Sequence, residues 1–350
     1  MRIETVAGPS LGRAYRDLVR TSPAGMFTHS PWWLEMLRSV SGGEVSAVRA
    51  MRGEDLLAAM PMVVSEDRGA GRVLNSLPFF GSHGGIVASD EARDDGRVAS
   101  RMLAELDRVA AERSCRSATL ILSPSGAWEA SCRRSWRPDF EDERIGQITP
   151  LPDTEDRLMD LYSGSRRNNV RKARKAGVEV TREETDEALA FLRDLHLEAM
   201  EAKGGTPKPP AFFDWCSSRL DASFLRIYTA RIDGVRVAGA LIFVFADDLE
   251  YYLPVIDLDY SAENPLVLVV HEVMEEGIRE GRDRFNFGGT WTDQDGVYRF
   301  KTQFGARDHR YRYLTKLYDP ELRTASRDRL REAFPHFFVI PYRELTGDSA

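Results

Sequence analysis

A lysine set among aromatic residues late in the chain is the first candidate for chemistry. Lys301 is flanked by Phe300 and Phe304, and a short apolar stretch that ends in Gly288 and Gly289 precedes it. Lysine is rarely buried without a partner, and glycines let a backbone approach a ligand closely. An ammonium that points into a cleft can stabilise the oxyanion of a tetrahedral intermediate. The alternative is a side chain that covers an apolar helix face and keeps its charge in water.

A basic run at residues 164–175, GSRRNNVRKARK, is the second candidate. It has six basic residues and no acidic one. Such a run is typical of a solvated helix face, or it binds phosphates of a nucleotide, a diphosphate or an RNA end. Asparagines can add hydrogen bonds to phosphate or sugar. On the binding hypothesis, the contacting residues are Arg166, Arg167, Asn168, Asn169, Arg171, Lys172 and Lys175.

Two further segments carry side chains suited to binding. Tyr251 and Tyr252 are neighbours on a predicted strand, so they face opposite sides, and one of them can line a cleft rather than a core. The stretch 78–85, PFFGSHGG, places His83 in a glycine-rich loop after a strand. It lacks the P-loop lysine and the dinucleotide fingerprint, so it lines a pocket or forms an aromatic-anchored turn.

Metal and nucleophile signatures are missing from the sequence. The six histidines are dispersed without metal-ligand spacing, and there is no nucleophile elbow or zinc-protease motif. The three cysteines are too few and too scattered for a disulfide framework or a zinc site, so we expect reduced, buried thiols. We predict no metal and no bound cofactor.

Length and composition indicate a globular protein of about two domains. The chain has 350 residues, of which 42% are hydrophobic and 29% charged. Its net charge of −7 gives no global basic field, so a polyanion site has to be a local patch. No signal-peptide pattern or membrane-spanning stretch is present. We expect a cytoplasmic protein without membrane insertion; the sequence does not fix its oligomeric state, and a monomer is compatible with it.

The two halves of the chain repeat one order of elements. Hydrophobic periodicity predicts β-α-α-β-β-β-α-β-α-β in each half, which is the order of the acetyltransferase fold called GNAT. In the second half, Asp233-Gly234 is a hairpin signal, and Pro265 suits the first turn of a helix. The predicted class is therefore α+β, with two tandem GNAT-like modules, each a mixed, mostly antiparallel sheet flanked by helices. We assign them to residues 1–160 and 161–350.

Taken together, these motifs resemble the FemABX family. The resemblance rests on Gly288-Gly289 followed by FKxxFG at 300–305, on the basic stretch, on Ser30-x-x-Trp33 and on the loop PFFGSHGGI. It implies a double GNAT-like fold that transfers an aminoacyl group from aminoacyl-tRNA to an amine, on a peptidoglycan precursor or a small peptide or natural product. It also implies that Lys301 stabilises the oxyanion. The family's substrate tyrosine matches Tyr252, with Tyr251 as the alternative.

Acceptor recognition departs from the cell-wall enzymes of that family. Where they carry a lysine four residues after the early tryptophan, this chain has Leu37, and Arg38 lies one position further. Their arginine-proline loop is replaced by residues 82–85. The substrate-binding residues that the resemblance implies, besides the two tyrosines, are Phe300, Phe304, Gly288, Gly289, His83, Arg38 and Trp33.

Two alternatives stay open at this point. An acyl-CoA donor needs a pyrophosphate cradle at a helix start, and the matching segment, residues 256–265, has three acids and no glycine. A non-catalytic GNAT-like binding module would leave Lys301 in solvent and fill the cleft. No carboxylate is singled out by spacing as a general base; the candidates near the third strand and the lysine are Asp247, Asp248, Glu250, Asp293 and Asp295.

Overall fold

The computed structural model describes residues 1–79, 83–93, 95–125, 128–290 and 294–345. The chain divides into two compact units, each described by itself below. The first comprises Met1–Ile145 and His309–Ala350, and the second comprises Gly146–Asp308. Asp293, a predicted base candidate, and residues 80–82 of the glycine-rich loop lie outside the described residues.

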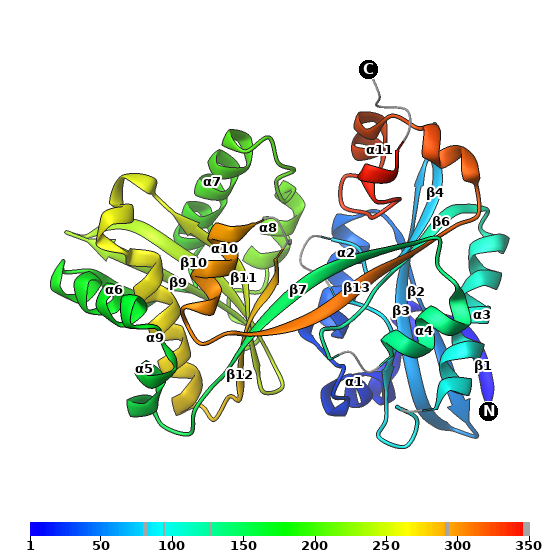
Figure 1. Ribbon diagram of the computed structural model, residues 1–350, viewed down its shortest axis with the longest axis horizontal. Coiled ribbons are helices and arrows are strands. Elements are labelled where there is room, and N and C mark those ends of the chain that lie inside the picture. Colours follow the sequence, from blue (N-terminus) through cyan, green and yellow to red (C-terminus); the bar gives the residue numbers. More distant parts are fainter. Residues whose placement is uncertain (80–82, 94, 126–127, 291–293, 346–350) are drawn as a thin grey trace. The chain divides into compact units, whose positions relative to one another are not determined.

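The first unit is a mixed sheet with helices packed on it (Figure 1). Its strand order is β1-β2-β3-β4-β6-β13, with β5 beside β3, and only the β4–β6 pair is parallel among these pairs. The strands are β1 (Arg2–Ala7), β2 (Glu44–Arg52), β3 (Asp55–Asp67), β4 (Gly71–Ser76), β5 (Val87–Ala88), β6 (Cys115–Ile121) and β13 (Arg307–Leu317). The helices are α1 (Gly12–Thr21), α2 (Pro31–Val40), α3 (Gly96–Glu112), α4 (Glu129–Trp136) and α11 (Arg327–Ala333).

The second unit repeats this plan. Its strand order is β7-β12-β11-β10-β9-β8; β8 to β11 are antiparallel, and β11 and β12 are parallel. The strands are β7 (Phe140–Pro150), β8 (Glu179–Arg182), β9 (Leu225–Ile232), β10 (Val235–Phe245), β11 (Asp248–Ile256) and β12 (Arg284–Thr290). The helices are α5 (Leu158–Leu161), α6 (Gly164–Lys175), α7 (Asp186–Ala202), α8 (Pro210–Ser217), α9 (Pro265–Arg279) and α10 (Asp295–Thr302).

Local signals in the sequence set several of these boundaries. Ser163 accepts a hydrogen bond from the backbone N–H of Arg166 and so caps α6. Pro265 occupies the first turn of α9, where its missing N–H costs nothing. Asp233 and Gly234 both have positive φ, 49° and 80°, as a two-residue turn between β9 and β10 requires. The predicted hairpin is confirmed.

Helices cover both faces of the second unit's sheet. α9 packs on β8 to β11, and Gly277 of α9 faces Leu249 of β11. α7 packs on β9 to β11, and Phe212 of α8 stacks on Tyr252. Because successive residues of β11 point to opposite faces, Leu249 and Tyr251 enter the core under α9, whereas Glu250 and Tyr252 point toward α7 and α8.

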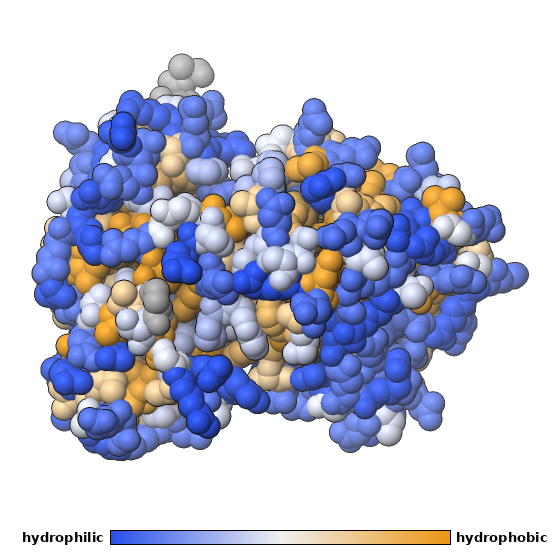
Figure 2. All heavy atoms as spheres, turned by 180° about the vertical axis from the view of Figure 1, so that it is seen from behind, coloured by the Kyte–Doolittle hydropathy of each residue, from blue (hydrophilic) through white to orange (hydrophobic). Residues whose placement is uncertain are grey.

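The surface is as polar as the composition predicts. On the face drawn in Figure 2, hydrophilic side chains cover most of the molecule, with smaller apolar areas between them. In the described ranges, no helix combines the length and the apolar character needed to cross a bilayer.

The final strands do not follow the linear division at residue 160. Tyr313–Leu317 of β13 pairs with β6, and residues 309–350 belong to the first unit. Conversely, β7 continues into the second unit, where its neighbour is β12. The last strand of each half of the chain therefore joins the sheet of the other unit. The predicted division into residues 1–160 and 161–350 did not include this exchange.

Candidate active site

Two strands part in the middle of the second unit. The β11–β12 pairing covers Asp248–Glu250 and Arg284–Asn286 and ends there, although both strands continue. The last pair joins Glu250 to Asn286, and the Asn286 side-chain amide donates a 2.7 Å hydrogen bond to Glu250. The side-chain oxygen of Asn286 accepts a hydrogen bond from the N–H of Gly288 at 2.9 Å. Asn286 therefore fixes both the Glu250 carboxyl group and the Gly288 backbone where the two strands separate.

Lys301 of α10 lies at this point. Its side chain is 5% exposed. Nζ donates to Thr290 Oγ1 at 2.8 Å and to the carbonyl oxygen of Gly289 at 3.0 Å, with that of Gly288 at 3.5 Å. Gly288 has φ 70°, a conformation that favours glycine and turns its carbonyl toward the lysine. Lys301 forms no ion pair with any residue that the structure describes; burial therefore dominates and lowers its pKa to about 8.

A hydrogen-bond chain holds the lysine's main partner in place. Thr290 Oγ1 donates to the Gln147 side chain at 2.8 Å, and the Gln147 amide donates to the carbonyl of Tyr298 at 3.4 Å. Tyr298 is on α10 itself. The two strands β7 and β12 thus fix the hydroxyl that accepts the lysine's shortest hydrogen bond, and the contact of Nζ with the Gly288 carbonyl, at 3.5 Å, is the longest of its three.

Glu250 is the carboxylate nearest to this arrangement. It is 4% exposed, and one of its oxygens lies 3.9 Å from the position where a Cβ on Gly288 would stand. Burial, with the nearby Asp248 charge, raises the pKa of Glu250 to about 8, while Asn286 and Lys301 oppose the rise. Glu250 and Lys301 therefore converge on Gly288 as a buried acid and a buried base of similar pKa.

Arg166 holds the helix that carries the lysine. Its guanidinium donates to the Phe300 carbonyl at 3.1 Å and to the Gln303 side chain at 2.8 Å, and it stacks 4.2 Å from the centre of the Phe304 ring. Arg166 is buried, and burial lowers its pKa to about 10. We predicted an exposed phosphate contact here; the structure instead shows a guanidinium engaged in fastening α10 to α6.

A pocket of about 410 Å³ opens beside the start of α9. Its walls include Arg166 and Asn169 of α6, Asn264 before α9, and Arg299 and Phe300 of α10. A helix start exposes unpaired N–H groups and favours anions. The three acids of 256–265 that argued against a pyrophosphate are not among the described residues that line this pocket. Two arginines line it instead, so that objection to an anionic ligand is removed.

Tyr252 lies on the face of β11 that Glu250 shares. Its ring packs against Phe212 and Phe243, and Nζ of Lys208 lies 4.4 Å from the ring centre. Lys208 is only 7% exposed, and burial lowers its pKa to about 8. Lys208 was not among the site residues predicted from the sequence. Glu250 was one of five candidate general bases, and the sequence analysis did not rank it above the others. The alternation of side chains along a strand already placed it on the same face as Tyr252.

Other predicted site residues of the second unit are core residues. Tyr251 is buried against Phe285 and Phe287, and its hydroxyl has no hydrogen-bond partner among the described residues. Phe304 is completely buried and packs on Phe287. These two side chains support the site from beneath, whereas Phe300 borders the pocket.

The predicted residues of the first unit do not form one cluster there. Trp33 is fully buried between Phe27 and Phe79, so it serves the core. His83 is 1% exposed, and its ring meets that of Tyr311 edge to face. Arg38 is exposed on α2 and lines a pocket of its own.

The rest of the basic run forms a surface on α6. Arg171, Lys172 and Lys175 are exposed, and no described carboxylate pairs with them. Asn168 is exposed and accepts a hydrogen bond from Arg171. Arg167 is half-buried and donates to the Tyr162 carbonyl. The run therefore contains one buried arginine and a free basic face.

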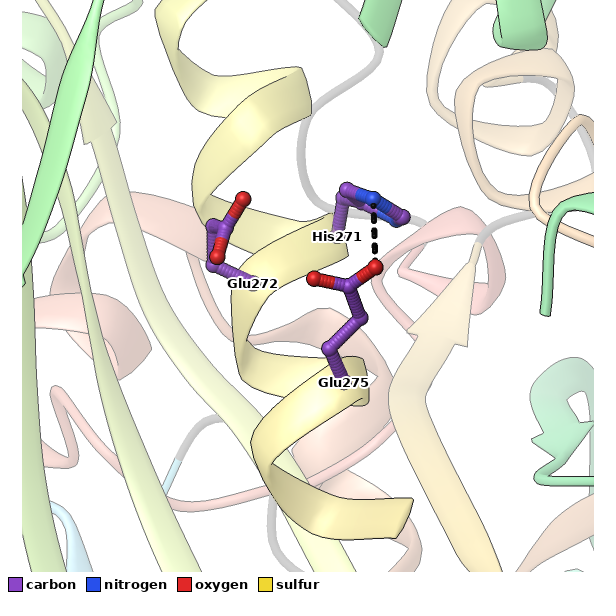
Figure 3. Close-up of side chains that lie close together, drawn as sticks. All are labelled: His271, Glu272 and Glu275. Carbon is purple, nitrogen blue, oxygen red and sulfur yellow. Dashed lines mark ion pairs between the residues drawn. The ribbon is translucent and has the colours of Figure 1, made fainter. Parts of the chain in front are cut away.

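One group of possible metal ligands is present within the described ranges (Figure 3). His271, Glu272 and Glu275 project from α9, and His271 Nε2 lies 3.1 Å from Glu275. Arg174 already pairs with both glutamates, at 3.0 and 3.5 Å, and Tyr162 contacts the other ring nitrogen. Burial and Arg174 lower the pKa of His271 to about 4. The guanidinium occupies the place of a cation, so this cluster fastens α6 to α9.

Comparison with known proteins identifies the fold. Residues 164–302 match the family model of the acetyltransferase (GNAT) domain. No curated protein matches the chain in sequence. A crystal structure of FemX superposes with a TM-score of 0.70 at 13% identity, covering 90% of this chain and 97% of FemX.

Two further structures are similar over most of their length. A tandem GNAT protein from the clavulanic acid biosynthesis pathway, solved without AcCoA, gives a TM-score of 0.55 at 12% identity, covering 91% of this chain and 99% of that protein. L-PGS from Bacillus licheniformis gives 0.53 at 13% identity, covering 86% and 90%. The predicted α+β fold of two tandem GNAT-like modules, and the FemABX-like arrangement, are confirmed. The match to the acetyltransferase (GNAT) domain model lies within the second module.

Proposed function

We propose that the protein is an acyltransferase that forms an amide bond on an amine, with aminoacyl-tRNA as the donor. The observation that carries this proposal is the convergence of Lys301 and Glu250 where β11 and β12 part. A non-catalytic module would leave the lysine in solvent, but it is 5% exposed. Burial without a direct ion pair disfavours the charged forms of both groups and moves both pKa values to about 8, and such shifts are typical of functional sites.

Each residue then has a defined part in the reaction. Glu250, as carboxylate, takes the proton from the attacking ammonium, and the neutral nitrogen adds to the carbonyl carbon of the donor ester. The Lys301 ammonium stabilises the oxyanion by its charge and by redirecting the N–H that makes only the long 3.5 Å contact with Gly288. When the intermediate collapses, the C–O ester bond breaks, and the proton that the attacking nitrogen loses passes to the ribose oxygen, which leaves as a hydroxyl; Glu250 then releases its own proton to solvent. Arg166 acts as a positioning residue because it holds α10.

The pocket at the start of α9 supports an anionic donor. Arg299 and Asn169 can bind phosphates there, and the free basic face of α6, with Arg171, Lys172 and Lys175, continues along the same helix as Asn169. An extended basic surface suits a nucleic acid, which makes many phosphate contacts. We take the acceptor to be a small peptide or natural-product amine or a peptidoglycan precursor, with Tyr252 on its side of the sheet.

An acyl-CoA donor is the second candidate. It is favoured by the pocket itself, because a pyrophosphate fits a helix start lined by two arginines. Titration with deacylated tRNA and with coenzyme A, each at two salt concentrations, separates the two. We expect salt-dependent tRNA binding that weakens when Arg171 and Lys172 are changed to Gln. Binding of coenzyme A alone would establish the second candidate, and binding of neither would refute both donors.

A further inference from the structure

The first unit contains a pocket to which the proposed mechanism assigns no role. It has a volume of about 420 Å³ and lies between α1 and α2, against the start of β2. Ligand pockets for small molecules begin at about 300 Å³. Its apolar lining consists of Leu11, Leu34 and Val45, which are 8%, 5% and 6% exposed, together with Pro31.

Basic side chains surround this apolar floor. Arg16 of α1 and Arg38 of α2 both line the pocket and are exposed. Neither forms an ion pair or hydrogen bond with a residue in the described part of the chain, whereas Arg13, also at the rim, pairs with Asp17 at 3.4 Å. Glu35 is the acid among the lining residues. The rim therefore offers two unused guanidiniums in a protein of net charge −7.

We propose that this pocket binds a small amphiphilic anion, with an apolar body on the leucine and valine floor and a carboxylate or phosphate head between Arg16 and Arg38. Guanidinium groups recognise both heads through paired N–H donors. The face of α2 that forms the pocket carries Leu34 and Arg38, and the fully buried Leu37 points elsewhere. The site is thus distinct from the interior side of α2.

Calorimetric titration of the full-length protein tests this inference. The probes are decanoate, decyl phosphate, decanol and inorganic phosphate, all below micellar concentrations, with neither acyl donor nor amine present. We expect both amphiphilic anions to bind, decanol and phosphate to bind at least about five-fold more weakly, and the tighter of the two anions to identify the head group.

Variants locate the binding. Arg16→Gln and Arg38→Gln should each weaken decanoate or decyl phosphate about five-fold, and the double variant more than ten-fold. Arg20→Gln is the matched control, because it removes the same charge from α1 one turn beyond the pocket. Equal affinity in all variants, or no binding of either anion, would overturn the inference. Since no transfer is measured, the result is independent of the proposed reaction.

Discussion

Replacing Lys301 by Met should alter the pH dependence of stability in a way that only a buried ammonium explains. Burial lowers the pKa of the lysine from 10.5 to about 8, a difference worth about 3 kcal/mol between its charged and neutral forms. Between these pH values the unfolded chain binds more protons than the folded one. The unfolding free energy of the native protein should therefore rise with pH across this interval.

The variant lacks this contribution. Near neutral pH, loss of the buried charge favours Lys301→Met by about 3 kcal/mol, and loss of a donor to the Gly289 carbonyl costs about 1–3 kcal/mol. The two proteins should thus have similar stability there. From about pH 7.5 to 10, the native protein should gain about 2–3 kcal/mol over the variant.

Urea unfolding followed by circular dichroism measures this difference. If the units unfold separately, the second unit's transition is the one to compare. Lys172→Met, an exposed lysine of α6 in the same unit, is the control and should track the native protein. A difference between native protein and Lys301→Met that stays constant over this pH range would refute the burial argument.

Other predictions concern activity and donor binding. Glu250→Gln should lower kcat by about 10²–10⁴-fold. It should also remove the limb of the kcat profile that rises toward pH 8, where Glu250 becomes a carboxylate, and keep the fall above pH 8, where Lys301 loses its charge; an unchanged rising limb would exclude Glu250 as the base. Arg299→Gln should weaken donor binding about five-fold, measured by titration, and unaltered affinity would mean that the α9 pocket is not the donor site. Changing Arg171 and Lys172 to Gln should reduce the slope of log affinity for tRNA against log salt by about 1–2. An unaltered slope would mean that the basic face of α6 is a solvated helix face that does not bind tRNA.

Much of the fold follows from local sequence. The alternating and helical periodicities, the Asp233-Gly234 turn and the Pro265 helix start are all short-range signals, and the structure confirms the elements that they predict. The partner of a strand is not such a signal. β13 pairs with β6, about 190 residues earlier in the chain, and nothing in the composition of residues 307–317 specifies that choice.

The candidate site was predicted in part. Aromatic neighbours indicated that Lys301 is unusual, and its burial fits that interpretation. The direction of the Arg166 side chain could not be read from a basic run, because a helix turns its residues toward both solvent and core. Glu250 and Lys208 acquire their shifted pKa values from burial by distant segments, which a linear pattern does not report.

The most direct test of the central claim is a transfer assay with a pool of radiolabelled aminoacyl-tRNAs and a mixed set of small peptide and natural-product amines. The native protein should move label from acid-precipitable tRNA into new amides. Lys301→Met, shown to be folded by circular dichroism, should do so about 10²–10³-fold more slowly. Transfer at equal rates by both proteins would contradict the role of the lysine, and absence of transfer by the native protein would contradict the proposed donor.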